Sequence, residues 1–217
     1  MYGVADYRRD QLVREEDALE RFPEKRGHYS ASKQEAERYV LQAMKEGGLS
    51  VVVLRPGTIY GPGGDTFTPM MGFAMGQKLF VVIGNGKFVL PFVYVDNLAG
   101  AIIRSIQNDR AISKVFNVVD IERVTKREYV NKFIKSLYPK ARILYMPFGF
   151  LYLLTGFQEM MLGMMKRKPF LTRYRLNSSQ KSIIYDNSKI IETLDWKPLV
   201  SFKTTVKNMI DHETRSC

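Results

Sequence analysis

The fold is decided by Tyr29-Ser30-Ala31-Ser32-Lys33 and by a second segment that follows about one helix and one strand later, Leu54-Arg55-Pro56-Gly57-Thr58-Ile59-Tyr60-Gly61-Pro62-Gly63. If Tyr29 opens a helix, Lys33 lies one turn further along the same face, about 5–6 Å away between Cβ atoms. The ammonium would favour the phenolate and lower the pKa of Tyr29 from its free value of about 10. Such a tyrosine can exchange a proton with a carbonyl oxygen while hydride moves to the carbonyl carbon. A surface tyrosine beside a solvated lysine is the alternative.

The residues after Lys33 predict a helix and then a strand. Gln34 to Met44 keeps a helical spacing, with a predicted buried face made of Ala36, Tyr39, Val40, Ala43 and Met44. Gly47-Gly48 supplies a helix stop. Ser50 to Leu54 is dominated by β-branched residues without alternation, as expected of a strand buried on both faces of a parallel sheet. Pro56 ends this strand and places Pro56-Gly57-Thr58 where open α/β sheets bind ligands.

The middle of the chain predicts further elements around turns. Residues 65–76 predict either a short helix lining a substrate cleft or a packed core segment, since methionine suits both. Residues 79–83 and 87–95 predict two strands around the turn Gly84-Asn85-Gly86. Asp96 is predicted to cap a helix over 97–106, whose buried face would consist of Leu98, Ala101, Ile102 and Ser105.

The rest of the chain predicts shorter alternating elements. Residues 115–119 predict a buried strand, Thr125 is predicted to begin a helix that Pro139 stops, and residues 141–147 predict a strand that returns to the substrate region. Residues 183–185 predict a short strand, Asn187 or Ser188 a helix cap, and residues 202–210 a closing amphipathic helix. The substrate region is therefore assembled from separated pieces, as in a cleft between lobes.

Phe148 to Met165 is the most apolar stretch. Phe150, Leu153, Phe157, Met160 and Met164 recur at helical spacing, which predicts a helix with one continuously apolar face. Glycines and polar residues interrupt the stretch, whereas a transmembrane helix needs about 20 largely apolar residues. Ordinary packing, a sterol-facing helix and a helix on a membrane surface stay open. The basic run Lys166-Arg167-Lys168 would suit anionic headgroups, so peripheral membrane contact through 148–168 is one prediction.

The composition bounds the class of protein. With 217 residues and 45% hydrophobic content, the chain can bury a sizeable core. A net charge of +11 invites a nucleic-acid partner, but the basic residues are scattered and no binding motif accompanies them, so none is expected. The single cysteine, Cys217, forms no internal disulfide, and no basic-then-apolar leader stands at the start. We expect a cytoplasmic protein without a metal site, with membrane association through 148–168 as the alternative to a freely soluble one.

Several motifs in order carry a family resemblance. They resemble the extended short-chain dehydrogenase/reductase superfamily, also described as NAD-dependent epimerase/dehydratases. The apolar stretch followed by Lys168-Pro169-Phe170-Leu171-Thr172-Arg173 is most similar to its 3β-hydroxysteroid dehydrogenase-like branch. The motifs are Tyr29 to Lys33, Leu54 to Gly63, Phe92-Val93-Tyr94-Val95-Asp96-Asn97-Leu98-Ala99, Val115-Phe116-Asn117-Val118-Val119, Tyr185-Asp186-Asn187-Ser188-Lys189 and Leu194-Asp195-Trp196-Lys197-Pro198.

The resemblance implies a fold and a domain organisation. The fold would be α/β, the C-terminal part of a doubly wound Rossmann-type parallel sheet with a small substrate-binding lobe. Residues 1–120 would be the C-terminal part of the NAD(P)-binding Rossmann domain, with 65–92 contributing to the lobe. Residues 121–217 would form mainly the lobe.

The resemblance also implies an activity and its residues. The activity would be NAD- or NADP-dependent hydride transfer at a hydroxyl or carbonyl carbon, on a sterol-like or other lipophilic small molecule. Tyr29 would be the general acid/base. Lys33 would hold the nicotinamide ribose hydroxyls, and Pro56, Gly57, Thr58 and Ile59 would border the nicotinamide. The superfamily often dimerises through the helix that carries the tyrosine and lysine, which implies a homodimer.

Two parts of the family pattern are absent. Residues 1–28 contain no serine or threonine, whereas the family places a catalytic hydroxyl just before a Tyr-Gly pair like Tyr2-Gly3. The sequence also contains no Gly-rich turn of the G-x-x-G-x-x-G kind, which would receive the pyrophosphate at a helix N-terminus. We therefore expect a C-terminal fragment that is inactive alone, with about a hundred residues missing ahead of Met1. The choice between NAD and NADP stays open.

Two rival functions remain. A nucleoside-diphosphate-sugar epimerase or dehydratase would use the same tyrosine and lysine and would need basic groups such as Lys87 or Arg173 near a diphosphate. The apolar stretch 148–165 favours a lipophilic substrate instead. In another class, the chain would be a non-catalytic cofactor-sensing or interaction protein, because the phosphate-binding turn and the catalytic hydroxyl are both absent.

Overall fold

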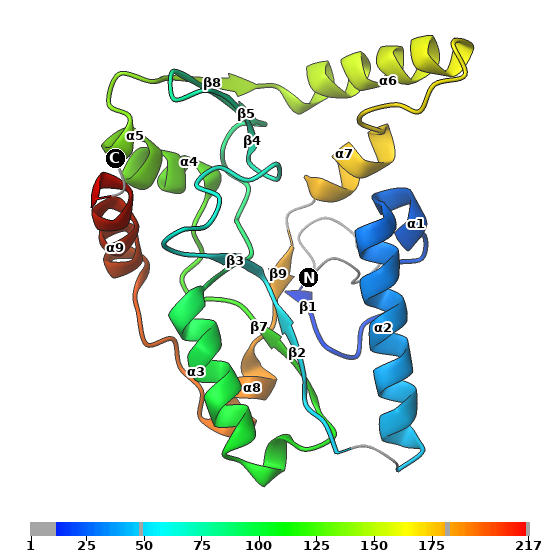
Figure 1. Ribbon diagram of the computed structural model, residues 1–217, viewed down its shortest axis with the longest axis vertical. Coiled ribbons are helices and arrows are strands. Elements are labelled where there is room, and N and C mark those ends of the chain that lie inside the picture. Colours follow the sequence, from blue (N-terminus) through cyan, green and yellow to red (C-terminus); the bar gives the residue numbers. More distant parts are fainter. Residues whose placement is uncertain (1–11, 48–49, 181–182, 216–217) are drawn as a thin grey trace.

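The computed structural model describes residues 12–47, 50–180 and 183–215, which form a mixed α/β structure (Figure 1). The strands are β1 (Leu12–Val13), β2 (Val53–Pro56), β3 (Thr58–Tyr60), β4 (Gly72–Met75), β5 (Leu79–Ile83), β6 (Phe92–Tyr94), β7 (Val115–Val118), β8 (Arg142–Met146) and β9 (Ile184–Tyr185). The helices are α1 (Pro23–Arg26), α2 (His28–Lys45), α3 (Val95–Ile106), α4 (Lys126–Tyr129), α5 (Lys135–Leu137), α6 (Phe148–Met164), α7 (Arg173–Ser179), α8 (Ser188–Leu194) and α9 (Phe202–Arg215). Two shorter turns are η1 (Asp109–Ala111) and the π-helical η2 (Val130–Ile134).

Parallel pairing dominates the strands, as the α/β prediction requires. β2 pairs with β7, β3 with β6 and β1 with β9, all in parallel. Figure 1 shows β2 and β7 between α2 on one side and α3 on the other. Parallel strands need crossover connections, usually helices, and α2 and α3 lie in such connections.

A three-stranded unit corrects two predictions. β5 pairs antiparallel with β4 and parallel with β8, so residues 79–95 are not a hairpin, and residues 72–75 are a strand, not part of a helix. The backbones come very close at Gly72, where an added Cβ would stand 1.8 Å from the Val81 carbonyl oxygen. Apolar residues in 65–76 could not reveal this approach, because their spacing suits a helix and a strand equally.

Two helix predictions are also wrong in detail. α2 begins and ends about where predicted, and Val40, Ala43 and Met44 of its predicted face are half-buried. Ala36 and Tyr39 of that face are exposed, however, and Gln34 and Glu37 lie inward instead. They do so because they make polar contacts: Gln34 donates to the Glu20 carbonyl oxygen, and Glu37 accepts from Arg55. Asp96 is not a cap: α3 starts at Val95 after Tyr94, and Asp96 lies within the first turn. There an acidic side chain complements the helix dipole. Ile102 of its predicted face is exposed as well.

Other local predictions are confirmed. Pro56 ends β2, although the strand covers Val53–Pro56 where 50–54 was predicted, and Val53 and Leu54 are half-buried where full burial was expected. Thr125 begins α4 with a capping box, its hydroxyl accepting from the Glu128 N–H while the Glu128 carboxylate accepts from the Thr125 N–H. The apolar stretch forms helix α6. Tyr2-Gly3 and Gly48 lie outside the described residues.

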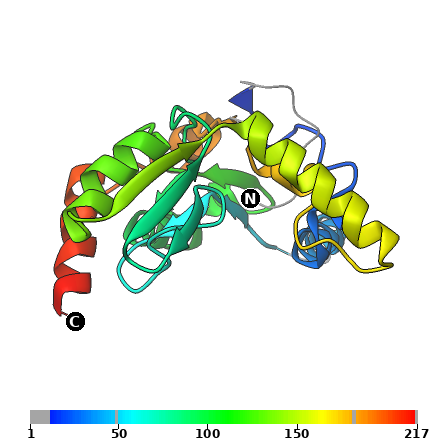
Figure 2. The ribbon, with the colours of Figure 1, turned by 90° about the horizontal axis from the view of Figure 1, so that it is seen from above.

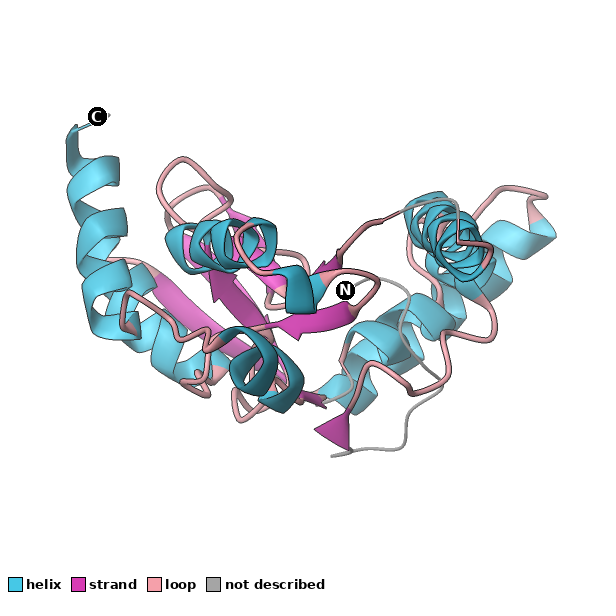
Figure 3. Ribbon diagram, turned by 90° about the horizontal axis from the view of Figure 1, so that it is seen from below, coloured by secondary structure: helices cyan, strands magenta, loops and turns pink. Residues whose placement is uncertain are grey.

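The apolar core lies in one region of the molecule. Its largest cluster joins aromatic and aliphatic side chains of β3, β5, β6, α4, η2 and α9, with Tyr129 and Phe133 near its centre. A second cluster gathers Phe116, Val118, Ile190 and Trp196. Figure 3 shows strands between helices in this region, whereas α6 lies along an outer edge in Figures 1 and 2.

Candidate active site

The first turn of α2 presents the predicted pair. Tyr29 is 61% exposed, and the Lys33 Nζ lies 5.7 Å from the centre of its ring. This distance is within the range of a cation–π contact. The prediction that Tyr29 opens a helix and that Lys33 lies one turn along the same face is confirmed. The helix thus offers a phenol and an ammonium to the same solvent-facing space.

A buried ion pair fixes α2 against strand β2. Arg55 is buried, and its Nε donates to the Glu37 carboxylate of α2 over 2.9 Å. Its second guanidinium arm donates to the Glu15 carbonyl oxygen, also over 2.9 Å. Glu37 lies one helical turn beyond Lys33, so this contact sets the position of the catalytic candidates relative to the end of β2.

A buried carboxylate extends the same network to β7. Glu15 accepts from the Asn117 backbone N–H over 2.7 Å, and the Asn117 side chain donates to the Val13 carbonyl oxygen. Burial raises the pKa of Glu15. Arg55 and Asn117 both lie in the family-like motifs of the sequence, which gave neither residue a predicted role. An arginine inside an apolar strand is itself a signal, because buried charges are almost always paired.

The segment Pro56-Gly57-Thr58-Ile59 turns from β2 into β3. Gly57 donates its N–H to the Val118 carbonyl oxygen, and Thr58 donates to that of Pro91. An added Cβ on Gly57 would stand 2.3 Å from the Pro91 oxygen, so only glycine fits here. Pro56 is half-buried and the Ile59 side chain is exposed.

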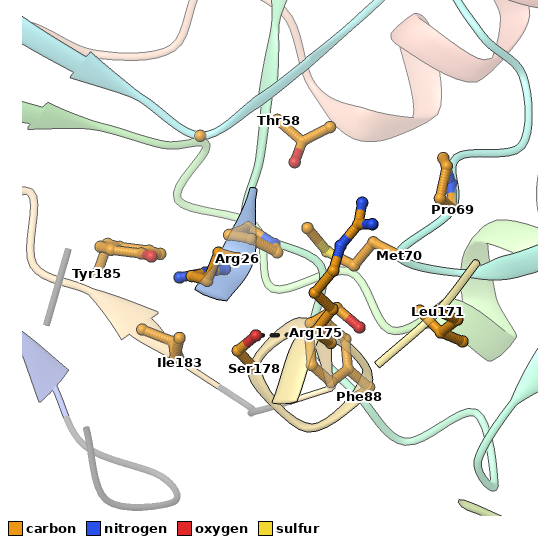
Figure 4. Close-up of a pocket in the computed structure, with 13 residues that line it drawn as sticks. Arg26, Thr58, Pro69, Met70, Phe88, Leu171, Arg175, Ser178, Ile183 and Tyr185 are labelled. Carbon is orange, nitrogen blue, oxygen red and sulfur yellow. Dashed lines mark hydrogen bonds between the residues drawn. The ribbon is translucent and has the colours of Figure 1, made fainter. Parts of the chain in front are cut away.

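A pocket opens beside this segment (Figure 4). Gly57 and Thr58 line it together with apolar side chains, among them Met70, Phe88 and Leu171. Two guanidinium groups stand at it: that of Arg175 from α7 and that of Arg26 from α1, whose Nη1 lies 3.5 Å from the Glu20 carboxylate. Figure 4 shows the Arg175 side chain reaching from α7 toward Thr58. The pocket therefore combines an apolar wall with positive charge and hydroxyl groups.

The structure brings only part of the predicted site together. Gly57 and Thr58 line the pocket, while Tyr29, Lys33, Pro56 and Ile59 are not among its lining residues. Arg26 connects the two parts along the chain, because it lines the pocket and ends α1 two residues before α2 begins. Within the described ranges, no group of His, Cys, Asp or Glu side chains could hold a metal ion.

The basic groups suggested for a diphosphate are placed elsewhere. Arg173 donates from its Nε to the Glu159 carboxylate of α6 over 2.7 Å, and Lys87 is exposed in the turn after β5. Neither lines the pocket, whereas Arg26 and Arg175 do. Motif order did not distinguish these arginines, because the pocket forms only when α1 and α7 pack together.

The comparisons with known proteins agree with this architecture. A family model described as the NAD dependent epimerase/dehydratase family matches residues 1–118. The chain belongs to this family. The matched part includes the Tyr29–Lys33 turn, the Arg55–Glu37 pair and the segment from Pro56 to Ile59.

Curated relatives narrow the branch of this family. The chain is 27% identical over 208 residues to 3beta-hydroxysteroid-dehydrogenase/decarboxylase isoform 1 of Arabidopsis thaliana, covering 87% of the chain and 46% of that relative. It is 31% identical over 166 residues to short-chain dehydrogenase/reductase family 42E member 1 of Bos taurus, covering 67% and 42%. These likenesses confirm the extended short-chain dehydrogenase/reductase superfamily and its 3β-hydroxysteroid dehydrogenase-like branch. The chain spans less than half the length of either relative.

Solved structures of this epimerase/dehydratase type share the fold. UDP-glucose 4-epimerase from Thermotoga maritima, solved with UDP-glucose, aligns with a TM-score of 0.68 at 18% identity, covering 99% of this chain and 61% of that one. UDP-glucuronic acid 4-epimerase from Bacillus cereus, solved with NAD, aligns with a TM-score of 0.68 at 16% identity, covering 96% and 58%. At this identity the likeness shows the fold, and it confirms the predicted Rossmann-type α/β class.

The described residues include groups of the kind that would bind one end of a dinucleotide. An exposed phenol and ammonium on α2, together with the Thr58 hydroxyl beside a glycine, offer donors for a ribose and a ring amide. The printed sequence contains no Gly-rich phosphate-binding turn to receive a pyrophosphate. The fit therefore concerns the nicotinamide end alone.

Proposed function

We propose that a protein containing this chain is an NAD-dependent oxidoreductase that moves hydride at a hydroxyl or carbonyl carbon of a lipophilic, sterol-like substrate. The observation that carries the proposal is the Tyr29–Lys33 pair, exposed on the first turn of α2 and held to the end of β2 through Glu37 and Arg55. Membership in the NAD dependent epimerase/dehydratase family supports it. So does the likeness to a 3beta-hydroxysteroid-dehydrogenase/decarboxylase.

Tyr29 would hold and move the proton. In an oxidation, its phenolate oxygen would take the proton of the substrate hydroxyl, and in a reduction the phenol would return it. The Lys33 amine lies beside the ring, where as an ammonium it would stabilise the negative charge that develops on the oxygen. When bound, the nicotinamide would supply or accept the hydride. Lys33 would donate to the ribose hydroxyls, and Pro56 to Ile59 would border the ring.

The pocket supports a mainly apolar substrate. Met70, Phe88, Pro91, Leu171 and Ile183 form its apolar wall. Apolar walls with a few placed polar groups are typical of small-molecule sites. The hydroxyl groups of Thr58 and Ser178 would orient the polar end of such a substrate.

A second candidate is a nucleoside-diphosphate-sugar epimerase or dehydratase. The observation that favours it is the pair of guanidinium groups, Arg26 and Arg175, at the same pocket. Guanidinium groups bind phosphate oxygens in a bidentate manner. Replacing Arg175 with Met would weaken the binding of a diphosphate substrate strongly and the binding of a sterol only slightly. Steady-state KM values for a sterol and for a UDP-sugar separate the two candidates.

Replacing Tyr29 with Phe in the full-length natural protein tests the shared chemistry. We expect kcat to fall about 10²- to 10⁴-fold, because the proton donor is lost while the ring remains. Tyr39→Phe is a matched control on the same helix, since Tyr39 is 60% exposed and also lies beside a cation, with the Arg38 guanidinium 5.4 Å from its ring. Its kcat should stay unchanged. Equal turnover of Tyr29→Phe and the unaltered protein would favour a cofactor-sensing role over catalysis.

The family resemblance also supports a homodimer of the full-length protein through α2. Of the 18 residues of this helix, ten are exposed, so this part of its surface is available to another chain. Sedimentation equilibrium of the full-length protein measures the mass directly. A monomer at micromolar concentration would contradict this part of the proposal.

A further inference from the structure

Helix α6 exposes an apolar stripe along its whole length. Leu153 is 73% exposed and Met164 is 76% exposed. With their neighbours they recur every three or four residues, which places them on one side of a helix. The stripe consists of Phe150, Leu153, Leu154, Phe157, Met160 and Met164.

The other side of α6 contacts α7 and its approach. Glu159 accepts from the backbone N–H and the Nε of Arg173, and Gln158 donates to the Leu171 carbonyl oxygen. Thr155 is buried, and Leu151 and Leu162 on the same side are half-buried. The helix is thus anchored to the protein by this side, which turns the exposed stripe outward.

Exposed cations follow the stripe directly. Lys166, Arg167 and Lys168 are all exposed, and Phe170 beyond them is 84% exposed. Any apolar partner could bury the stripe, but a purely apolar partner would offer these cations no negative charge. An anionic bilayer surface satisfies both, because acyl chains receive the apolar side chains and lipid phosphates receive the cations.

The dimensions of α6 select a position on the membrane, not across it. At 1.5 Å per residue its 17 residues extend about 25 Å, shorter than the hydrocarbon core of about 30 Å. In the part of the chain that the structure describes, no helix is long and apolar enough to cross a bilayer. Figures 1 and 2 show α6 along an outer edge of the molecule.

We propose that α6 and residues 165–170 dock the protein on the surface of an anionic lipid bilayer, with the helix axis in the plane of the membrane. The stripe from Phe150 to Met164 lies at the boundary between headgroups and acyl chains. Lys166 to Lys168 contact lipid phosphates. Arg173 stays with Glu159 and keeps the helix attached to α7.

Vesicle flotation of the full chain tests this docking. The probes are vesicles of phosphatidylcholine alone and vesicles of phosphatidylcholine with phosphatidylserine. We expect binding to the second kind and a strong decrease at high salt. Lys166→Gln/Arg167→Gln/Lys168→Gln should lower the partition coefficient on anionic vesicles about 100-fold, at roughly tenfold or less per cation. Leu153→Ser/Phe157→Ser should lower it by a similar factor.

Matched variants outside α6 and residues 165–170 show whether binding depends on this surface or only on total exposed apolar area and total charge. Ile103 and Ile106 of α3 are 52% and 78% exposed, so Ile103→Ser/Ile106→Ser removes comparable apolar surface. Lys135→Gln/Lys203→Gln/Lys207→Gln removes three other exposed cations. Neither set should change the partition coefficient more than about twofold. Circular dichroism spectra of all four variants should match that of the unaltered protein.

Two outcomes overturn the proposal. One is equal loss of binding in the α6 variants and in their matched controls, which would mean that total charge or hydrophobicity drives the binding. The other is no binding to either vesicle combined with a dimer that Leu153→Ser/Phe157→Ser dissociates in sedimentation equilibrium. In that case a second copy of the chain covers the stripe.

Discussion

Two regions of this molecule are held together in different ways. Around η2, β5, β6 and α9, large side chains are fully buried, and the rings of Tyr129 and Phe133 pack 5.2 Å apart. In the region of α1, α2, α6 and α7, the helices bury almost nothing: α1 has no buried residue, α2 has Ser30, α6 has Thr155 and α7 has Leu176. The hydrophobic effect therefore stabilises mainly the first region, which we call the packed region. It stabilises the second, which we call the anchored region, much less.

Polar contacts replace the missing apolar core in the anchored region. Arg55 holds α2 through Glu37. Glu20 accepts from the Tyr174 hydroxyl over 2.7 Å and so ties the approach to α1 to α7. The candidate catalytic and binding groups all lie in or beside this region. Segments with few buried apolar contacts open at low free-energy cost, which suits a site that admits a cofactor and a substrate.

The comparison predicts that the same substitution, Phe to Ala, lowers the free energy of unfolding much more in the packed region than in the anchored region. Phe133→Ala in η2 removes a fully buried ring and should lower the free energy of unfolding by about 3–5 kcal/mol. Phe150→Ala in α6 removes a ring that is 55% exposed and should change it by less than about 0.5 kcal/mol. Urea denaturation of both variants, in the absence of lipid, measures the difference.

Similar losses in the two variants would break the distinction between the regions. A large loss for Phe150→Ala would mean that α6 packs against another part of the protein in solution. In that case the membrane docking proposal would fail as well, because its stripe would already be covered.

Local signals in the sequence predicted elements whose cause is local. The capping box at Thr125, the proline that ends β2 and the apolar periodicity of α6 each depend on neighbouring residues, and all three are present. Partners far apart in the chain were harder to predict. Strand β4 exists because Gly72 allows a close approach to Val81, and the inward side of α2 is chosen by Arg55, 18 residues beyond Glu37. Periodicity assumes that buried sides are apolar, whereas the fully buried residues of α2 and α6 are Ser30 and Thr155.

The candidate site follows the same division. The Tyr29–Lys33 pair depends on helical spacing within one turn, which the sequence displays. The pocket arginines Arg26 and Arg175 come from α1 and α7, which meet only in the folded protein. Sequence reasoning therefore found the pair and the glycine segment but suggested Lys87 and Arg173 for the positive charge.

A buried lysine at the junction of the two regions gives the second prediction. Lys126 is fully buried, and its Nζ donates to the Ile83 carbonyl oxygen over 3.1 Å and to the side chain of Gln180, the residue after α7. Burial lowers the pKa of Lys126 from 10.5 to about 7. A neutral amine keeps two N–H donors, which suffice for both acceptors. The folded protein therefore favours the neutral form above about pH 7.

The pH dependence follows from this lowered pKa. Between pH 7 and pH 10.5 the unfolded chain binds a proton at Lys126 that the folded chain has released, so stability gains a contribution that rises with pH across this window. Over the whole window the gain is about 5 kcal/mol, and it is absent below pH 7. Lys126→Met should remove this rise, whatever its effect on stability at one pH. Urea denaturation of both proteins from pH 6 to pH 10 measures it. If the free energy of unfolding changes with pH in parallel for the two proteins, the lowered pKa of Lys126 is contradicted.

Substitution of Arg55 separates the two regions most directly. Arg55→Leu leaves the Glu37 carboxylate and the Glu15 carbonyl oxygen without their partner and should cost about 2–3 kcal/mol, less than a fully buried pair because Glu37 is partly exposed. Because Arg55 is the anchor of α2, amide hydrogen exchange in α2 should accelerate about 30-fold or more, while the amides of Val130–Ile134 change little. Arg55→Leu/Glu37→Leu removes both charges and should recover part of the loss. If exchange in η2 accelerates equally, the ion pair stabilises the whole fold. In that case α2, with its tyrosine and lysine, does not open separately from the packed region.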